Sequence, residues 1–201
     1  MSRKESPEIN AGSMADIAFL LLIFFLVTTT MDVESGIIRK IPKKEKVADN
    51  IRIKEKNILE VNINLRNELF VDGKIVHLKD IKQITIDFID NAGGVDNNNT
   101  PCNWCEGNRL PTSSDHPSKA FISVKTDRNA NYETYILVLD QLNTAYTHLR
   151  NKLGVKLYNQ NYESLLADFK KSNQQEKAIE TKIKIIREKY PLLISDADMI
   201  N

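Results

Sequence analysis

The sequence lacks a surplus of charge of either sign, with 28 Lys and Arg residues against 27 Asp and Glu residues and a net charge of +1. Proteins that bind nucleic acid by neutralising phosphates carry a large basic excess, so nucleic acid is not an expected partner. The sequence also lacks a Ser-His-Asp arrangement, a glycine-rich phosphate loop and an H-E-x-x-H motif. We therefore expect neither an enzyme nor a bound cofactor.

Apolar residues are concentrated in one place. The mean hydropathy of −0.37 and the 27% of charged residues exclude a protein with several membrane spans. Residues 17–27 (IAFLLLIFFLV) nevertheless contain no polar side chain, and from residue 11 to residue 31 the only ionisable side chain is that of Asp16. A helix of that length spans roughly 30 Å, the thickness of the hydrocarbon core of a lipid bilayer.

We interpret residues 12–31 as a retained single-pass transmembrane helix that follows a short tail over residues 1–11. A cleaved secretory signal is one alternative, since Arg3 and Lys4 precede the run, but no small-residue cleavage pattern follows it. A buried core helix is another alternative, and it would need a larger domain than 201 residues provide. Basic residues stand on both sides, so charge alone leaves the orientation open.

Asp16 is the residue of this segment that needs an explanation. A carboxylate in hydrocarbon costs on the order of 3 kcal/mol, and such acids usually face a protein partner or a water-filled path. In one interpretation Asp16 lies at the membrane interface and is solvated. In the other it carries protons, which requires partner helices because one acid on one helix forms no proton path. At about 100° per residue, five residues share its helix face: Gly12, which permits close approach of another helix, Leu20, Ile23, Val27 and Thr30.

The N-terminal pattern resembles that of the ExbD/TolR family of biopolymer-transport proteins. The likeness consists of Glu8-Ile9-Asn10, five intervening residues, Asp16 and the apolar run. Residues 121–128 (FISVKTDR) resemble a strand of the family that ends in a K-x-D element. The likeness covers roughly residues 6–150 and is weak in the middle. It ends in a helix with the residues Tyr132, Glu133, Val138, Asp140, Leu142 and Ala145.

The resemblance implies a subunit of a proton-driven motor in the inner membrane of a Gram-negative bacterium, with a cytoplasmic N-terminus and a periplasmic domain. It implies that the acid at the position of Asp16 takes up and releases protons. The implied partners are an ExbB-like multi-span ring protein, a second copy of the chain and a TonB-like energy transducer, and the implied output is transport across the outer membrane. A TolR-like role in envelope integrity and a passive membrane-anchored binding module are the alternatives.

The rest of the chain predicts a linker and an α+β domain with a mixed sheet and two main helices. Residues 32–56 hold eight basic and five acidic side chains, which is typical of a charged linker. It is either a solvated spacer or a surface for lipid headgroups. Alternating apolar residues predict strands, Asp72-Gly73 predicts a hairpin, and apolar spacing of three to four residues predicts helices. The expected strands cover 59–65, 69–71, 74–78 and 120–124, and the expected helices cover 79–91 and 132–150.

Residues 91–118 predict a loop insertion, and a loop this long is usually functional or disordered. It contains both cysteines, in the sequence Cys102-Asn103-Trp104-Cys105. Three uses of the pair are open: a zinc site, for which His116 supplies at most one further ligand, a redox site, or a local disulfide. The oxidising periplasm that the resemblance implies favours the disulfide. His77 and His148 have no acidic or nucleophilic companion at useful spacing, so we interpret both as structural.

Residues 151–190 predict a helical extension. Residues 172–175 separate two apolar stripes, so we expect two helices. Pro191 ends the second helix, and the apolar run that follows, residues 192–195, is predicted to be the closing strand of the sheet. The first stripe is Tyr162, Leu165, Leu166 and Phe169, and the second is Ile179, Ile183, Ile186 and Tyr190.

Overall fold

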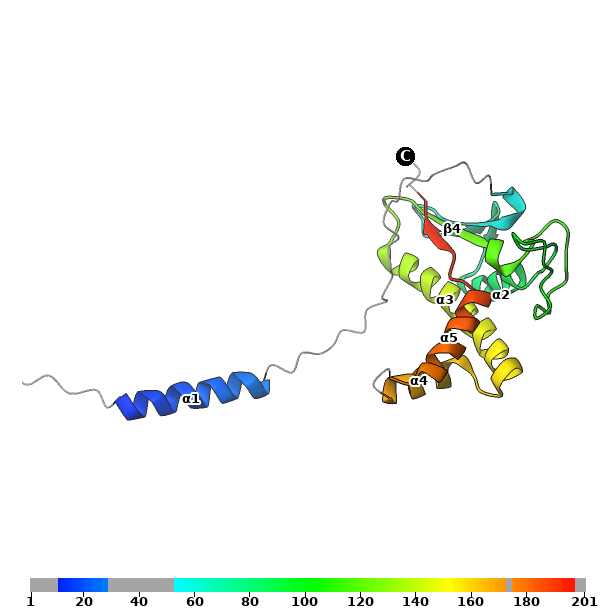
Figure 1. The fold of residues 1–201 in the computed structure, drawn as a ribbon. Helices are drawn as coiled ribbons and strands as arrows, with labels where there is room; N and C mark the ends of the chain where they lie inside the picture. The colour runs from blue at the N-terminus through cyan, green and yellow to red at the C-terminus, as the bar shows by residue number, and fades with distance from the viewer. Residues whose placement is uncertain (1–10, 29–52, 173–174, 198–201) are drawn as a thin grey trace, which may run out of the picture. The chain divides into compact units, whose positions relative to one another are not determined.

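The computed structural model describes residues 11–28, 53–172 and 175–197. The chain forms two compact units, Met1–Asn50 and Ile51–Asn201. The described part of the first unit is one helix, α1 (Ala11–Thr28), which begins one residue before the predicted span (Figure 1). None of the helices in the described part of the chain is long and apolar enough to cross a membrane. The last residues of the predicted span, 29–31, lie outside the described residues.

The second unit contains a five-stranded mixed sheet in the order β3-β2-β1-β4-β5. The central strand β1 is antiparallel to β2 and parallel to β4, and β4 is parallel to β5. This sheet, with helices packed on it, confirms the predicted α+β fold. The strands are β1 (Ile58–Ile63), β2 (Leu69–Val71), β3 (Lys74–Val76), β4 (Phe121–Thr126) and β5 (Ile194–Asp196).

The hairpin between β2 and β3 is confirmed, and its turn has the backbone that its sequence predicts. Asp72 and Gly73 have φ angles of 47° and 78°, and two successive positive φ angles match the right-handed twist of the strands they join. β3 ends at Val76, two residues before the predicted end, because His77 is the N-cap of the next helix.

The other strand boundaries are shifted by one or two residues. β1 ends two residues early because the Oδ1 atom of Asn64 accepts two backbone N–H groups at 2.9 Å and begins a turn. β4 extends two residues beyond the predicted end, since Thr126 still pairs with Ile63 of β1. The predicted closing strand is present as β5, although it begins at Ile194 rather than at residue 192.

The helices of the second unit confirm the predicted order, but two of them differ from their predicted bounds. The helix predicted over residues 79–91 begins one residue earlier and ends two residues earlier, at residue 89. α3 continues eight residues beyond the predicted end at residue 150, so residues 151–158, which were predicted to begin the helical extension, are the last part of α3. Gly154 lies where a Cβ atom would come within 2.7 Å of the Gln160 carbonyl oxygen. The helix ends at Asn159, whose φ of 53° is a left-handed cap. The helices are α2 (Leu78–Ile89), α3 (Tyr132–Tyr158), α4 (Tyr162–Lys171) and α5 (Lys177–Lys189).

The core lies between one face of the sheet and the helices. Alternate residues of β1 and β4, such as Val61 and Ile122, are fully buried on that face. The predicted stripes of α4 and α5 also reach the core, where Leu165 and Ile186 are fully buried. α4 lies at the end of the unit that is remote from β4 (Figure 1). The helical extension therefore packs on α3 and enlarges the same core.

The predicted linker was too long at its C-terminal end. Residues 53–56 belong to the folded unit, because a short 3-10 helix, η1 (Glu55–Asn57), leads directly into β1. Two lysines of this segment, Lys54 and Lys56, form ion pairs within the unit. The remainder of the predicted linker, residues 32–52, lies outside the described residues.

Candidate functional site

α1 carries the predicted proton-carrying residue, Asp16, whose side chain is exposed. Gly12, Leu20 and Ile23 lie on the same helix and, at about 100° per residue, on the same face as Asp16. Of the two other residues predicted for this face, position 27 is in α1 and position 30 lies outside the described residues. The large apolar side chains of α1 between Met14 and Phe25 are 41% to 61% exposed. An apolar surface of this kind needs a cover of lipid or protein.

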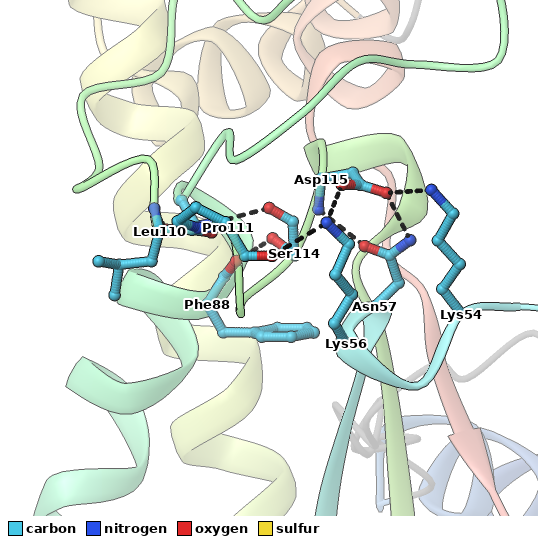
Figure 2. A network of polar contacts seen from close by, with 9 residues as sticks. Lys54, Lys56, Asn57, Phe88, Leu110, Pro111, Ser114 and Asp115 are labelled. Carbon is cyan, nitrogen blue, oxygen red and sulfur yellow. Dashed lines mark hydrogen bonds and ion pairs between the residues drawn. The ribbon is translucent and has the colours of Figure 1, made fainter.

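A polar network holds the start of β1 against the loop insertion (Figure 2). Its centre is Asp115, which is 5% exposed. The Lys56 Nζ atom lies 2.5 Å from Asp115 Oδ1, and Lys54 Nζ lies 3.4 Å from Oδ2. Asn57 makes two hydrogen bonds with the same residue: its Nδ2 donates to Asp115 Oδ2 at 3.2 Å, and its Oδ1 accepts from the Asp115 backbone N at 2.7 Å.

The charge of Asp115 is compensated within the fold. Burial raises the pKa of Asp115, but the hydrogen bonds from Lys56 and Asn57 and the charges of Lys56 and Lys54 lower it by more, so the pKa lies below its ordinary value. Lys56 Nζ also donates to the carbonyl oxygen of Pro111 at 3.1 Å. An ionised, fully paired carboxylate positions its neighbours and is not a proton acceptor at neutral pH.

The same network reaches the end of α2. The Ser114 Oγ atom donates to the carbonyl oxygen of Phe88, the penultimate core residue of that helix (Figure 2). Asn91 Nδ2 donates to the carbonyl oxygens of Leu110 at 3.0 Å and Ser114 at 2.8 Å. The far end of the loop insertion is thus joined to the end of α2 and to the start of β1, where the chain enters the folded unit.

Cys102 and Cys105 are joined by a disulfide inside the loop insertion, and both are buried. Between them, the Trp104 ring meets the His116 ring edge to face at a centroid distance of 5.4 Å. His116 is 4% exposed, and burial lowers its pKa. Its Nδ1 accepts from the Ser118 backbone N at 3.2 Å. In residues 11–28, 53–172 and 175–197, no group of three or more His, Cys, Asp and Glu side chains could hold a metal ion.

The loop insertion and the helical extension are bound to each other. Glu106 forms ion pairs with Lys152 at 2.6 Å and with Lys156 at 3.3 Å, both on the part of α3 that the sequence assigned to the extension. At the end of α5, the Lys189 Nζ atom lies 3.7 Å from the centroid of the Trp104 ring. The loop insertion and the helical extension are separate features in the sequence, but in the structure they pack against each other.

A cleft of about 390 Å³ opens at the carboxyl ends of β4 and β5. Tyr132 at its rim is 72% exposed, and the Tyr135 hydroxyl donates to Asp196 Oδ1 at 3.0 Å. The two charged residues of the K-x-D element lie in different places. Asp127 lines the cleft, whereas Lys125 forms an ion pair with Glu60 at 3.1 Å on the other face of the sheet. The lining residues are Val124, Thr126, Asp127, Arg128, Ala130, Tyr132, Tyr135, Asp196 and Ala197. A mostly apolar lining with a few charged residues is typical of a ligand-binding cleft.

Comparison with known proteins gives the family. The family model described as biopolymer transport protein ExbD/TolR matches residues 2–153, about three quarters of the chain. This chain belongs to the ExbD/TolR family. It is also similar to the biopolymer transport protein exbD2 of Vibrio cholerae, with 32% identity over 81 residues. That match covers 40% of this chain and 58% of the Vibrio protein.

The ExbD/TolR match ends inside α3, so it includes Asp16, the loop insertion and most of the cleft. α4, α5 and β5 lie beyond it. The polar network around Asp115 was missed by sequence reasoning. Asn57 and Asp115 are 58 positions apart, and neither stands in a motif, so no spacing signal connected them.

Proposed function

We propose that this chain is an ExbD-like, membrane-anchored subunit of a proton-driven motor, acting with a multi-span ring protein of the ExbB type. The motor uses the proton gradient across the inner membrane of a Gram-negative bacterium, and the folded unit transmits its motion in the periplasm to a TonB-like protein. The output is energy for transport across the outer membrane. The observation that carries the proposal is Asp16, the single ionisable side chain of α1, in a chain of the ExbD/TolR family.

Membrane anchoring is proposed from the apolar surface of the N-terminal segment and from the length of its apolar sequence, which continues beyond the described end of α1. The 18 residues of α1 span about 27 Å at 1.5 Å per residue, and a helix over the proposed span of residues 12–31 reaches about 30 Å. The exposed apolar side chains of α1 are the surface that lipid and partner helices would cover. With the N-terminus in the cytoplasm, the folded unit lies in the periplasm.

The proposed role of Asp16 follows from the cost of charge in hydrocarbon. The protonated acid is tolerated beside an apolar partner surface, whereas the ionised acid needs a polar one. Asp16 takes up a proton from the periplasmic side, passes a hydrophobic surface of the ring as the neutral acid and releases the proton toward the cytoplasm. Each change of charge favours a different position of α1 in the ring. A second copy of the chain supplies a second acid that alternates with the first.

The test is proton flux into liposomes that contain the full chain and its ring partner. Wild-type complex should dissipate an imposed proton gradient. Asp16→Asn, which mimics a permanently protonated acid, should reduce flux to that of protein-free liposomes while the chain still co-purifies with the ring. Asp16→Glu keeps an acid and should retain measurable flux. Met14→Asn places an amide about 160° around α1 from Asp16 and should leave flux unchanged. Wild-type flux in Asp16→Asn would refute the proton-carrying role and favour a passive anchored binding module.

A TolR-like role is the second candidate, since the matched family description names both proteins. In that case the same proton-driven subunit would serve envelope integrity instead of transport. Deletion of the gene separates the two. Loss of growth on iron bound to a siderophore, with normal resistance to detergent, supports the ExbD-like role, and the opposite pair of phenotypes supports the TolR-like role.

A further inference from the structure

The tip of the loop insertion is a small turn over residues 96–100 (DNNNT), closed by a β-bridge between Val95 and Pro101. The Asp96 backbone N donates to the Thr100 carbonyl oxygen at 2.9 Å. The Asp96 Oδ1 atom accepts from the backbone N atoms of Asn98 and Thr100, both at 2.8 Å. Residues 97–100 are all exposed. The turn is thus held by its own backbone and one carboxylate, with the side chains of residues 97–100 in solvent.

The side chains of this turn form an acceptor pattern for N-linked glycosylation. Asn98-Asn99-Thr100 is N-x-T with a residue other than proline in the middle. Of the 20 asparagines in the sequence, only Asn98 has Ser or Thr two positions later. An acid, Asp96, stands two positions before it, which gives the extended pattern D-x-N-x-T. The structure of the turn accounts for the acid at position 96, whose carboxylate accepts two of the hydrogen bonds of the turn. At positions 98 and 100 those hydrogen bonds involve only the backbone, so the turn does not require an amide or a hydroxyl side chain there.

We propose that Asn98 is a glycosylation site, and that the donor is an oligosaccharide linked through pyrophosphate to a membrane lipid. The proposal rests on the proposed function, because it needs the folded unit outside the inner membrane, where such donors are presented. The Asn98 Nδ2 atom forms a bond with C1 of the oligosaccharide as the bond between C1 and the pyrophosphate oxygen breaks. Lipid pyrophosphate leaves with the bonding electrons, and one amide proton passes to a base of the transferase. No atom changes oxidation state.

The fold lets a transferase reach this turn without unfolding the rest of the loop. The base of the loop is held separately, since Gly93 N donates to the Ser114 carbonyl oxygen at 3.0 Å and Gly94 N to that of Asp115 at 2.9 Å. The disulfide begins at Cys102, two residues after Thr100, and its two cysteines are buried. A transferase that draws residues 96–100 into an extended conformation therefore breaks only the hydrogen bonds of the turn.

The experiment is mass spectrometry of the full chain purified from the membrane fraction of its own host. Trypsin should release residues 83–109 as one peptide, since no Lys or Arg lies between Lys82 and Arg109. We expect this peptide to carry a glycan on Asn98. The glycan should be lost completely in Asn98→Gln and in Thr100→Ala. It should persist in Thr100→Ser, which keeps the hydroxyl, and in Asn97→Gln, which changes the neighbouring exposed amide.

An unmodified peptide overturns the proposal, as does a glycan that persists in Asn98→Gln. Protease digestion of spheroplasts separates this failure from failure of the proposed function. If protease added outside cleaves the folded unit and Asn98 is unmodified, the glycosylation site is wrong and the proposed orientation stands. If the folded unit is protected until the inner membrane is opened, both proposals fail.

Discussion

Asp16 in α1 and Asp115 in the folded unit are both acids, but the residues around them differ. Asp115 is 5% exposed and is bound by Lys54, Lys56 and Asn57, all from the segment that enters β1. Asp16 is followed along α1 by apolar side chains, which offer it neither a positive charge nor a hydrogen-bond donor. The folded unit therefore compensates its buried acid from within, whereas the apolar side chains that follow Asp16 in α1 provide no such compensation.

Under the proposed function, this difference assigns a stabilising role to Asp115 and a proton-carrying role to Asp16. A buried carboxylate with its own cations keeps one charge state and fixes local structure. A carboxylate on an apolar helix changes its preferred surroundings with its charge, which is what a proton-driven movement requires. We therefore expect substitutions in the folded unit to change its free energy of unfolding and not the proton flux per assembled complex, and Asp16→Asn to do the reverse.

The largest expected effect on stability is that of deleting residues 191–201. The deletion removes β5, which pairs with β4 on one edge of the sheet. It also removes Leu193, whose carbonyl oxygen accepts from Ile122 N at 2.8 Å and whose backbone N donates to the Tyr146 hydroxyl at 3.3 Å. We expect the truncated unit to lose its cooperative thermal transition, measured by circular dichroism. Deletion of residues 198–201 alone is the control, and an unchanged Tm after the longer deletion would contradict the role of β5.

A smaller effect is expected for Asp115→Asn. The substitution removes the charge that pairs with Lys56 and leaves Asn57 facing an amide, so it should cost about 1–3 kcal/mol of unfolding free energy in urea denaturation. Glu60→Gln is the control, because the Glu60–Lys125 pair is partly exposed and should contribute only about 0–1 kcal/mol. Proton flux per assembled complex should be unchanged in both variants. Loss of flux in Asp115→Asn without loss of stability would break the comparison between the two acids.

The smallest expected effect is a pH dependence that comes from His116. Burial lowers its pKa in the folded unit below the ordinary value of about 6.5. As the pH falls below that value, the unfolded chain takes up a proton before the folded unit does, so stability decreases. The decrease should not exceed about 1.4 kcal/mol per pH unit. Denaturation at pH 7 and pH 5 should show it as a difference between wild type and His116→Gln. The exposed His148→Gln variant should behave like wild type, and an equal pH response in all three would exclude His116 as the cause.

Periodicity predicted the elements of this fold well because it reflects burial directly. The stripes of α4 and α5 and the strand that follows Pro191 were all found in this way. The errors lie where a local hydrogen bond or a close backbone contact sets a boundary. Asn64 ends β1 by binding two backbone N–H groups, and Gly154 lets α3 continue against the chain at Gln160. Neither contact changes the spacing of apolar residues from which the elements were predicted.

The residues of the candidate site also fall into two groups: those that the sequence indicates and those that only the structure brings together. Asp16 stands out in the sequence because a single acid in an apolar run is costly wherever the run is buried. Asp115 does not stand out, because acids in polar loops are common and its partners are 58 to 61 positions away. Trp104 and Lys189 are likewise brought together only by the docking of the two insertions.

The sequence by itself determined the family pattern, the element order and the position of the one acid in α1, since each depends on local composition and spacing. Only the tertiary structure decided that the loop insertion packs against the helical extension. It also decided that the loop insertion forms hydrogen bonds and ion pairs with the segment that leads into β1. These contacts join residues distant in the sequence, and their energies depend on burial and distance, which spacing along the chain does not encode.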